Sequence, residues 1–130
     1  MKNFKYNSAI NYSGYRLGQS PLTRTYPSKK EILEDLLLLE GEFYYLRMYD
    51  CTEHLHSTLE LIEEHQLNFQ VMIGLSMHAE ENHINHPFFY IHKEDVLKDN
   101  VAKNDVLITE IIEISKKYEK YISSISIGNE

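Results

Sequence analysis

The sequence has 130 residues, of which 42% are hydrophobic and 25% are charged, as is typical of one folded domain rather than a disordered or fibrous chain. Its formal net charge of −7 argues against nucleic acid or an anionic membrane surface as a partner, and no apolar run approaches the roughly 18 residues of a membrane helix. Because the start of the chain lacks the apolar segment of a signal peptide and Cys51 is the single cysteine, we expect a cytoplasmic protein with neither an internal disulfide nor a cysteine-rich zinc site.

The first predicted elements are a short strand over residues 9–12 and a helix that begins after Ser28. Residues 13–21 contain two glycines and a proline, which favour a loop. Ser28 and Glu31 have the spacing of a capping box, and apolar residues recur behind them at helical intervals. We expect this helix to extend to about Glu40 and to end at Gly41.

The central part of the chain predicts two strands separated by a helix. Residues 43–49 form an aromatic strand in which Arg47 is the only charged residue. Leu55, Leu59 and Ile62 then recur at helical spacing, opposite an acidic face. Residues 69–75 are nearly continuously apolar, as expected for a strand that is covered on both faces.

The last part of the chain predicts a loop, a helix and a strand over residues 121–127. Residues 76–100 are polar and contain four histidines, so they favour a long loop or insertion with room for a short helix. The apolar stripe of the third helix comprises Leu107, Ile108, Ile111, Ile112 and Tyr118. Four strands that alternate with three helices predict an α/β protein with a parallel sheet. Residues 1–130 then form either the N-terminal half of a (β/α)8 TIM barrel, which needs roughly 250 residues when complete and here stops after its fourth strand, or a small open sheet.

Functional side chains of a parallel barrel gather where the strands end, because the loops converge there on one mouth. This rule selects candidates at the ends of the first, second and fourth strands, and only the weaker pair Ser76 and His78 at the third. The candidates are Asn11, Tyr12, Arg47, Tyr49, Asp50, Asn129 and Glu130.

Strand alternation places Arg47 on the inner face of the predicted sheet, where a guanidinium needs a carboxylate partner. Arg47 therefore either forms a structural ion pair or orients a catalytic carboxylate. In the last strand, alternation puts Ile122, Ser124 and Ser126 on the inner face with Gly128 and Glu130, and Ile125 and Ile127 on the helix-facing side. A glutamate beside apolar and aromatic walls can have a raised pKa and donate a proton at neutral pH.

Four segments resemble glycoside hydrolase family 17, the β-1,3-glucanase and glucanosyltransferase family, in the same order along the chain. Residues 46–50, Leu-Arg-Met-Tyr-Asp, resemble the family's second-strand motif, and residues 70–74 resemble its third strand. Residues 125–130, Ile-Ser-Ile-Gly-Asn-Glu, resemble the fourth strand, and residues 10–21 resemble the first strand and its loop. The resemblance covers the chain apart from residues 76–100.

The resemblance implies retaining hydrolysis of a β-glucan, with an oligo- or polysaccharide as partner and no cofactor or metal. Glu130 matches the family's general acid/base, and Asn129 matches the asparagine that binds the sugar's 2-hydroxyl. The family's nucleophile is a second glutamate after the seventh strand, so we expect these 130 residues alone to be inactive. The alternative is a noncatalytic half-barrel that binds carbohydrate or self-associates through its exposed sheet edges.

Histidines in the polar loop are the basis of a rival interpretation. The loop contains His78, His83, His86 and His92, and the chain also has His54 and His56. Three of the loop histidines, spaced by five and three residues with Glu80 and Glu81 between them, could approach a zinc or other divalent ion, but no HExxH motif is present and the spacing matches no compact site. A flavodoxin-like nucleotide domain is disfavoured, since no glycine-rich phosphate loop follows the first strand.

Overall fold

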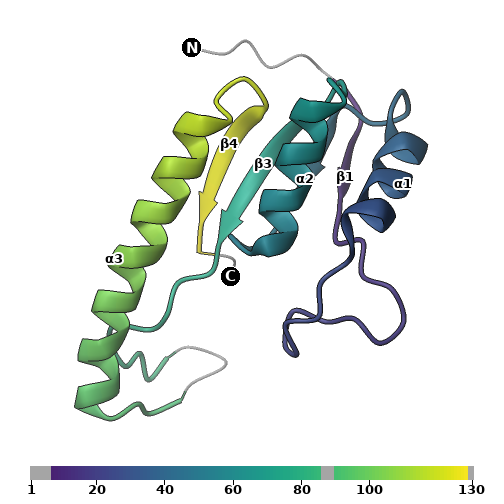
Figure 1. The fold of residues 1–130 in the computed structure, drawn as a ribbon. Helices are drawn as coiled ribbons and strands as arrows, with labels where there is room; N and C mark the ends of the chain where they lie inside the picture. Colours follow the sequence, from purple (N-terminus) through teal and green to yellow (C-terminus); the bar gives the residue numbers. More distant parts are fainter. Residues whose placement is uncertain (1–6, 86–89, 129–130) are drawn as a thin grey trace.

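Four parallel strands alternate with three helices in the computed structural model, which describes residues 7–85 and 90–128 (Figure 1). The strands lie in the sheet in chain order, β1-β2-β3-β4. The elements are β1 (Ala9–Asn11), α1 (Lys29–Leu39), β2 (Tyr45–Arg47), α2 (Glu53–Glu64), β3 (Gln70–Leu75), α3 (Glu94–Lys117) and β4 (Ile122–Ile127). None of the helices within these ranges is long and apolar enough to cross a membrane.

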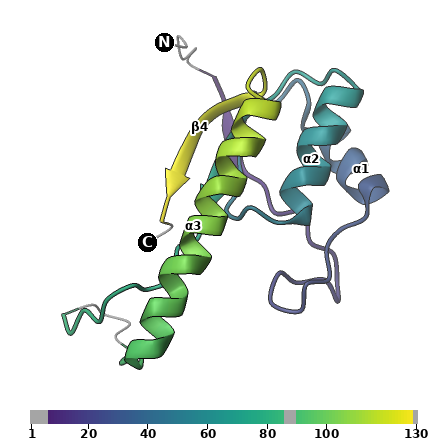
Figure 2. The same cartoon turned by 60° about the vertical axis from the view of Figure 1, so that its left-hand side comes forward.

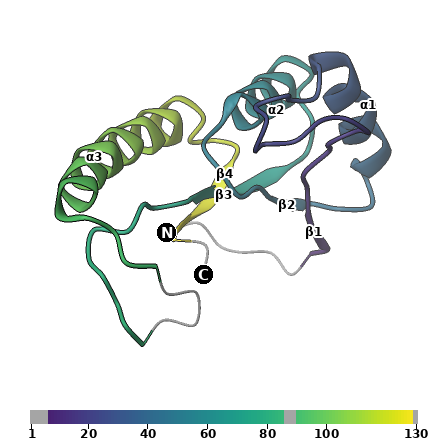
Figure 3. The same cartoon turned by 90° about the horizontal axis from the view of Figure 1, so that it is seen from below.

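All three helices lie on the same face of the sheet, as the view from below shows (Figure 3). Each crossover therefore returns on one side, and each new strand adds next to the one before it. A doubly wound sheet would instead carry helices on both faces. The predicted α/β class with a parallel sheet is confirmed, and the arrangement is compatible with half of an α/β barrel.

The first helix begins as its sequence predicts. The Ser28 side chain accepts a hydrogen bond from the Glu31 backbone, and the Glu31 carboxylate accepts one from the Ser28 backbone at 2.8 Å. This reciprocal pair satisfies two amide groups that a helix start leaves without partners. The helix ends at Leu39, and Gly41 turns the chain with a φ of +90°, a conformation that favours glycine.

The hydrophobic core lies between the sheet and its helices. Leu46, Val71 and Ile73 are fully buried on the strands, and the strand-facing sides of the helices cover them. The fully buried helical partners are Ile32, Leu36, Leu55, Leu59 and Ile62. The predicted apolar stripe of α2 is thereby confirmed.

Two predicted boundaries differ from the structure. The second strand covers only Tyr45–Arg47 rather than residues 43–49, because Phe43 forms an isolated bridge with Glu40 instead of joining the ladder. The polar residues 94–100, expected in the loop, form the first turns of α3, which extends past the ends of β3 and β4 (Figures 1 and 2). A helix of this length needs apolar contacts only where it meets the sheet.

The apolar stripe of α3 also differs in part from the prediction. Ile111, Ile114 and Tyr118 are buried against the core, whereas Ile112 is 45% exposed. Ile112 directly follows Ile111, and neighbouring residues on a helix point about 100° apart.

A register shift in β4 corrects the predicted alternation. Ile122 pairs with Val71 but Ser124 pairs with the next residue, Met72, so Ser123 is an extra residue. Ile122 is therefore buried at 7% exposure on the helix side instead of sharing the inner face with Ser124. Ile125 and Ile127 pair with the buried Ile73 and Leu75 and so lie on the helix-facing side as predicted, but they are 41% and 65% exposed.

Two buried asparagines on α3 hold the loop that follows β3. The Asn104 side chain accepts from the His78 backbone N–H at 2.9 Å and donates to the His78 carbonyl at 2.9 Å and to a Glu80 carboxylate oxygen at 2.8 Å. Asn100 donates to the Ala79 carbonyl at 2.7 Å. The projecting half of α3 thus has a polar anchor in place of an apolar one.

Candidate functional site

A row of side chains crosses all four strands, at the last residues of β1 and β2 and near the middle of β3 and β4. The Cα partners in this row are Asn11 with Arg47, Arg47 with Met72, and Met72 with Ser124. Residues in one row of a parallel sheet point to the same face. Since Leu46 and Val71, one step away, are buried beneath the helices, this row lies on the helix-free face.

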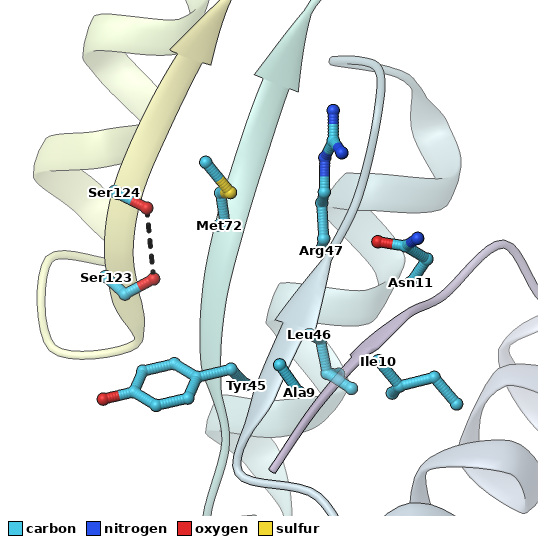
Figure 4. A pocket seen from close by; sticks show the side chains of 9 residues that line it. All are labelled: Ala9, Ile10, Asn11, Tyr45, Leu46, Arg47, Met72, Ser123 and Ser124. Atoms are coloured by element: carbon cyan, nitrogen blue, oxygen red, sulfur yellow. Dashed lines mark hydrogen bonds between the residues drawn. The ribbon is translucent and has the colours of Figure 1, made fainter. Parts of the chain in front are cut away.

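The row forms one side of a hollow of about 380 Å³ (Figure 4). The other side of the hollow is formed by the earlier residues of β1 and β2 and by Ser123, the extra residue of β4. The Ser123 hydroxyl lies 3.5 Å from that of Ser124. The lining residues are Ala9, Ile10, Asn11, Tyr45, Leu46, Arg47, Met72, Ser123 and Ser124. A tyrosine ring, two hydroxyls, an amide and a guanidinium thus line one concave surface, and none of its lining residues is acidic.

Arg47 extends in the direction of the strand arrows, toward the C-terminal edge of the sheet (Figure 4). Its guanidinium carbon lies 4.6 Å from the centre of the Tyr49 ring, within the range of a cation–π contact. Among the residues that the structure describes, no carboxylate lies within ion-pair distance of Arg47. The predicted structural ion pair is therefore not observed within these residues.

The sequence-predicted candidates divide between two places. Asn11 and Arg47 line the hollow, with Tyr49 beside Arg47. Tyr12, Tyr49 and Asp50 line a smaller hollow of about 90 Å³ with residues of the first loop and of α2, so Tyr49 lies between the two places. Tyr12 is only 6% exposed and its hydroxyl donates to Asp35 on α1 at 3.1 Å, so its placement differs from the expected sugar contact.

The ends of the second and third strands are joined by a polar contact that the sequence does not predict. The Ser76 hydroxyl donates to the Asp50 carboxylate, which links the residues that follow β2 and β3. Asn129 and Glu130, the predicted sugar ligand and acid/base, lie outside the described residues. They directly follow Gly128, whose amide donates to the Leu75 carbonyl at 2.9 Å and keeps the end of β4 beside β3.

Asp35 is the centre of a network that sequence patterns do not indicate. Besides the Tyr12 hydroxyl, its two oxygens accept bonds from Arg16 at 2.6 and 3.0 Å. This network ties the first loop to α1, and burial together with Asp35 raises the pKa of Tyr12. No local spacing signals a pair that lies 19 residues apart in the chain.

His54 is a buried titratable residue that the sequence also does not indicate. It is 3% exposed, and the rings of Tyr12 and Tyr15 each lie 5.3 Å from its ring, edge-on. Its Nε2 donates to the Ser13 carbonyl, so Nδ1 carries the lone pair, and Nδ1 is buried without a hydrogen-bond partner among the described residues. Burial lowers the pKa of His54, although the Ser13 carbonyl and Asp35 oppose this effect.

We expect His54 to make the fold less stable as the pH falls. The unfolded chain binds a proton at His54 with a pKa of about 6.5, whereas the folded chain resists that proton, so stability is complete above this pH and declines below it. The loss can reach about 1.4 kcal/mol per pH unit. Urea unfolding at pH 7.5 and pH 5.5 measures it, and His54→Gln should remove most of the difference between the two conditions.

His65 is exposed at the end of the same helix, so His65→Gln is the matched control. Its free energy of unfolding should depend on pH as that of the parent chain does. A His54→Gln chain that loses as much stability on acidification as the parent would show that another group is responsible.

The described histidines of the loop after β3 have different neighbours. His83 is exposed, with a Glu81 carboxylate oxygen 3.9 Å away, whereas the backbone groups of His78 and His92 are bound by Asn104 and Asn82. His86 lies outside the described residues. Within the described part of this loop, no three metal-ligating side chains come close enough together to share an ion.

Comparisons of the chain with models of known protein families, with curated proteins and with solved structures found no match.

Proposed function

We propose that the chain is the sugar-binding first half of a β/α-barrel glycoside hydrolase that acts on a β-glucan, with β-1,3-glucan as the substrate. The observation that carries this proposal is the hollow on the helix-free face. Asn11, Arg47 and Ser124 lie there in one row of the sheet, and Tyr45 lines the same hollow. Sugars are bound through many hydroxyl groups and an apolar ring face. The amide, hydroxyl and guanidinium groups of the hollow can hydrogen-bond to the sugar hydroxyls, and the aromatic ring can pack against the apolar face of the sugar ring.

The sheet topology supports the same proposal. A barrel of this class adds parallel strands in chain order and keeps its helices outside, so its inner face is the helix-free one. The four segments that resemble glycoside hydrolase family 17 overlap β1 and its loop, the end of β2, β3, and the end of β4. Ligands in such barrels bind at the C-terminal ends of the strands, toward which Arg47 extends.

The proposed chemistry is a retaining double displacement. Glu130, as general acid, would protonate the leaving glycosidic oxygen while a second carboxylate about 5 to 5.5 Å away forms the glycosyl-enzyme, and Glu130 would then deprotonate the attacking water. Asn129 would bind the sugar's 2-hydroxyl. Arg47 would position the sugar and, as a cation on the same face, favour the ionised form of a nearby carboxylate.

Binding of β-1,3-glucan oligosaccharides to the purified chain tests this proposal. We expect isothermal titration calorimetry to show binding that Arg47→Met weakens at least about tenfold, equivalent to about 1.4 kcal/mol, because the variant keeps the length of the side chain but loses its donors. Arg24→Met changes an exposed arginine of the first loop and should bind like the parent. No binding, or equal binding by both variants, would refute the sugar site.

Hydrolysis is expected to be absent in the same preparation. A retaining mechanism needs two carboxylates at the sugar, and none of the residues that line the hollow is acidic. Incubation with a β-1,3-glucan should therefore release no reducing sugar above background. Release that disappears in Glu130→Gln would contradict this expectation while supporting the role of Glu130.

A noncatalytic, self-associating half-barrel is the second candidate. Ile125 and Ile127 are exposed on the edge strand β4, and exposed apolar edges favour association. Light scattering coupled to size exclusion distinguishes this candidate, since a concentration-independent monomer excludes it.

A further inference from the structure

We propose that Cys51, His56 and Glu110 form a zinc-binding site between α2 and α3. One ligand atom from each residue lies within 4.8 Å of the other two, and this is the group of three metal-ligating side chains found among the residues that the structure describes. A thiolate, an imidazole and a carboxylate are all ordinary zinc ligands, and three protein ligands leave the fourth position open to water.

The three residues come from separate parts of the fold. Cys51 lies in the loop after β2, His56 in the first turn of α2, and Glu110 in the C-terminal half of α3. His56 Nε2 already lies 3.1 Å from a Glu110 carboxylate oxygen, close to the separation of about 3.4 Å between two ligand atoms of a tetrahedral zinc ion. The Cys51 sulfur lies within 4.8 Å of both atoms, so it has to approach by at most about 1.3 Å, which a change of its side-chain torsion can supply.

The site can be reached from solvent. The side chains of His56 and Glu110 are 45% and 39% exposed, and Glu110 also lines an open hollow together with Asp105 and Glu113. Cys51 is half-buried against the core. The half-buried sulfur and the carboxylate-rich approach favour a cation over an anion at this position.

The surroundings of Cys51 oppose a free thiolate. Burial and the neighbouring carboxylates of Glu110 and Asp50 raise the pKa of Cys51 to about 12. A divalent ion reverses this balance, because it neutralises Glu110 and binds the sulfur as a thiolate, whose proton passes to solvent. Because the site lies on the helix side of the sheet, its test is independent of the proposed sugar hollow.

Cobalt(II) is the probe for this site, because Cys51 is the single cysteine of the chain and a thiolate-to-cobalt charge-transfer band can arise only there. Reduced, dialysed protein should bind one equivalent of cobalt with this band and with the visible bands of a four-coordinate ion. Zinc should displace it. Cys51→Ser should abolish the charge-transfer band.

Two further variants test the other ligands without removing the sulfur. His56→Gln and Glu110→Gln should each weaken cobalt binding at least about tenfold. Mutating a residue that only hydrogen-bonds to a metal ligand already lowers metal affinity about 10- to 100-fold. Glu110→Gln is isosteric at a half-exposed position, so its fold should survive, which circular dichroism checks. His65→Gln and Glu94→Gln are the matched controls at exposed positions of the same two helices and should bind as the parent does.

Absence of the charge-transfer band would overturn the proposal. A band that is equally strong and equally tight in His56→Gln and Glu110→Gln would also overturn it, because the sulfur would then bind the ion with other partners. Unchanged cobalt affinity in Cys51→Ser would likewise overturn the proposal, because the ion would then bind without the sulfur.

Discussion

Gly74→Ala is expected to lower the free energy of unfolding by more than about 3 kcal/mol or to prevent folding. A β-carbon at this position would lie against the Tyr49 carbonyl oxygen, 2.7 Å from the Tyr49 carbonyl carbon and 2.8 Å from the Met48 carbonyl oxygen. All three atoms belong to the backbone that continues β2, so no side-chain rotation relieves the contact. The strands would have to separate beside the bond from the Met48 amide to the Met72 carbonyl, which is 2.9 Å long.

Gly41→Ala is the matched control for this prediction. Gly41 has a positive φ of +90°, but a β-carbon there would meet no atom within 4 Å, so alanine introduces only backbone strain of about 1–2 kcal/mol. Urea unfolding of the two variants separates steric conflict from conformational strain. Equal losses in the two variants would show that the close approach of β2 to Gly74 does not constrain the fold.

Asn104→Ala is expected to cost about 2–4 kcal/mol and to release the loop after β3. Asn104 is 1% exposed, and its side chain satisfies both the amide and the carbonyl of His78. Removing it leaves these two part-buried backbone groups without their side-chain partner. Hydrogen exchange should show faster exchange of the His78 amide, and urea unfolding should show the loss of stability.

Asn82→Ala provides a control with the same bonding pattern in a different environment. The Asn82 side chain brackets the backbone of His92 through two bonds of 2.9 and 3.0 Å, but Asn82 is exposed, so water can replace it. Its loss should cost less than about 1 kcal/mol. If Asn82→Ala and Asn104→Ala are equally destabilising, burial is not what makes Asn104 important.

Local patterns in the sequence predict those parts of the fold that depend on local interactions. The Ser28 capping box, the Gly41 turn and the apolar stripe of α2 each involve residues close together in the chain, and the structure confirms them. The start of α3 is not predictable in this way, because Asn100 and Asn104 anchor it through polar bonds to the loop, and these residues give no apolar periodicity.

Contacts across the sheet could not be predicted from local patterns. The extra residue in β4 reverses the side of Ile122, since a single insertion changes the parity of a strand. The alternation of β2 does place Arg47 on the face opposite Leu46. Tyr12 is the opposite case: it follows a strand end, as the rule for parallel sheets requires, yet its ring turns toward Asp35 and His54.

The most direct test of the proposed function is nuclear magnetic resonance of the labelled chain during titration with a β-1,3-glucan oligosaccharide. If the helix-free face binds the sugar, chemical-shift changes will concentrate at Asn11, Tyr45, Arg47 and Ser124. The chemical shifts of Lys29 and Glu60, an ion pair between helices, will stay unchanged. Shift changes confined to the helix side, or no changes at saturating sugar, would contradict the proposal.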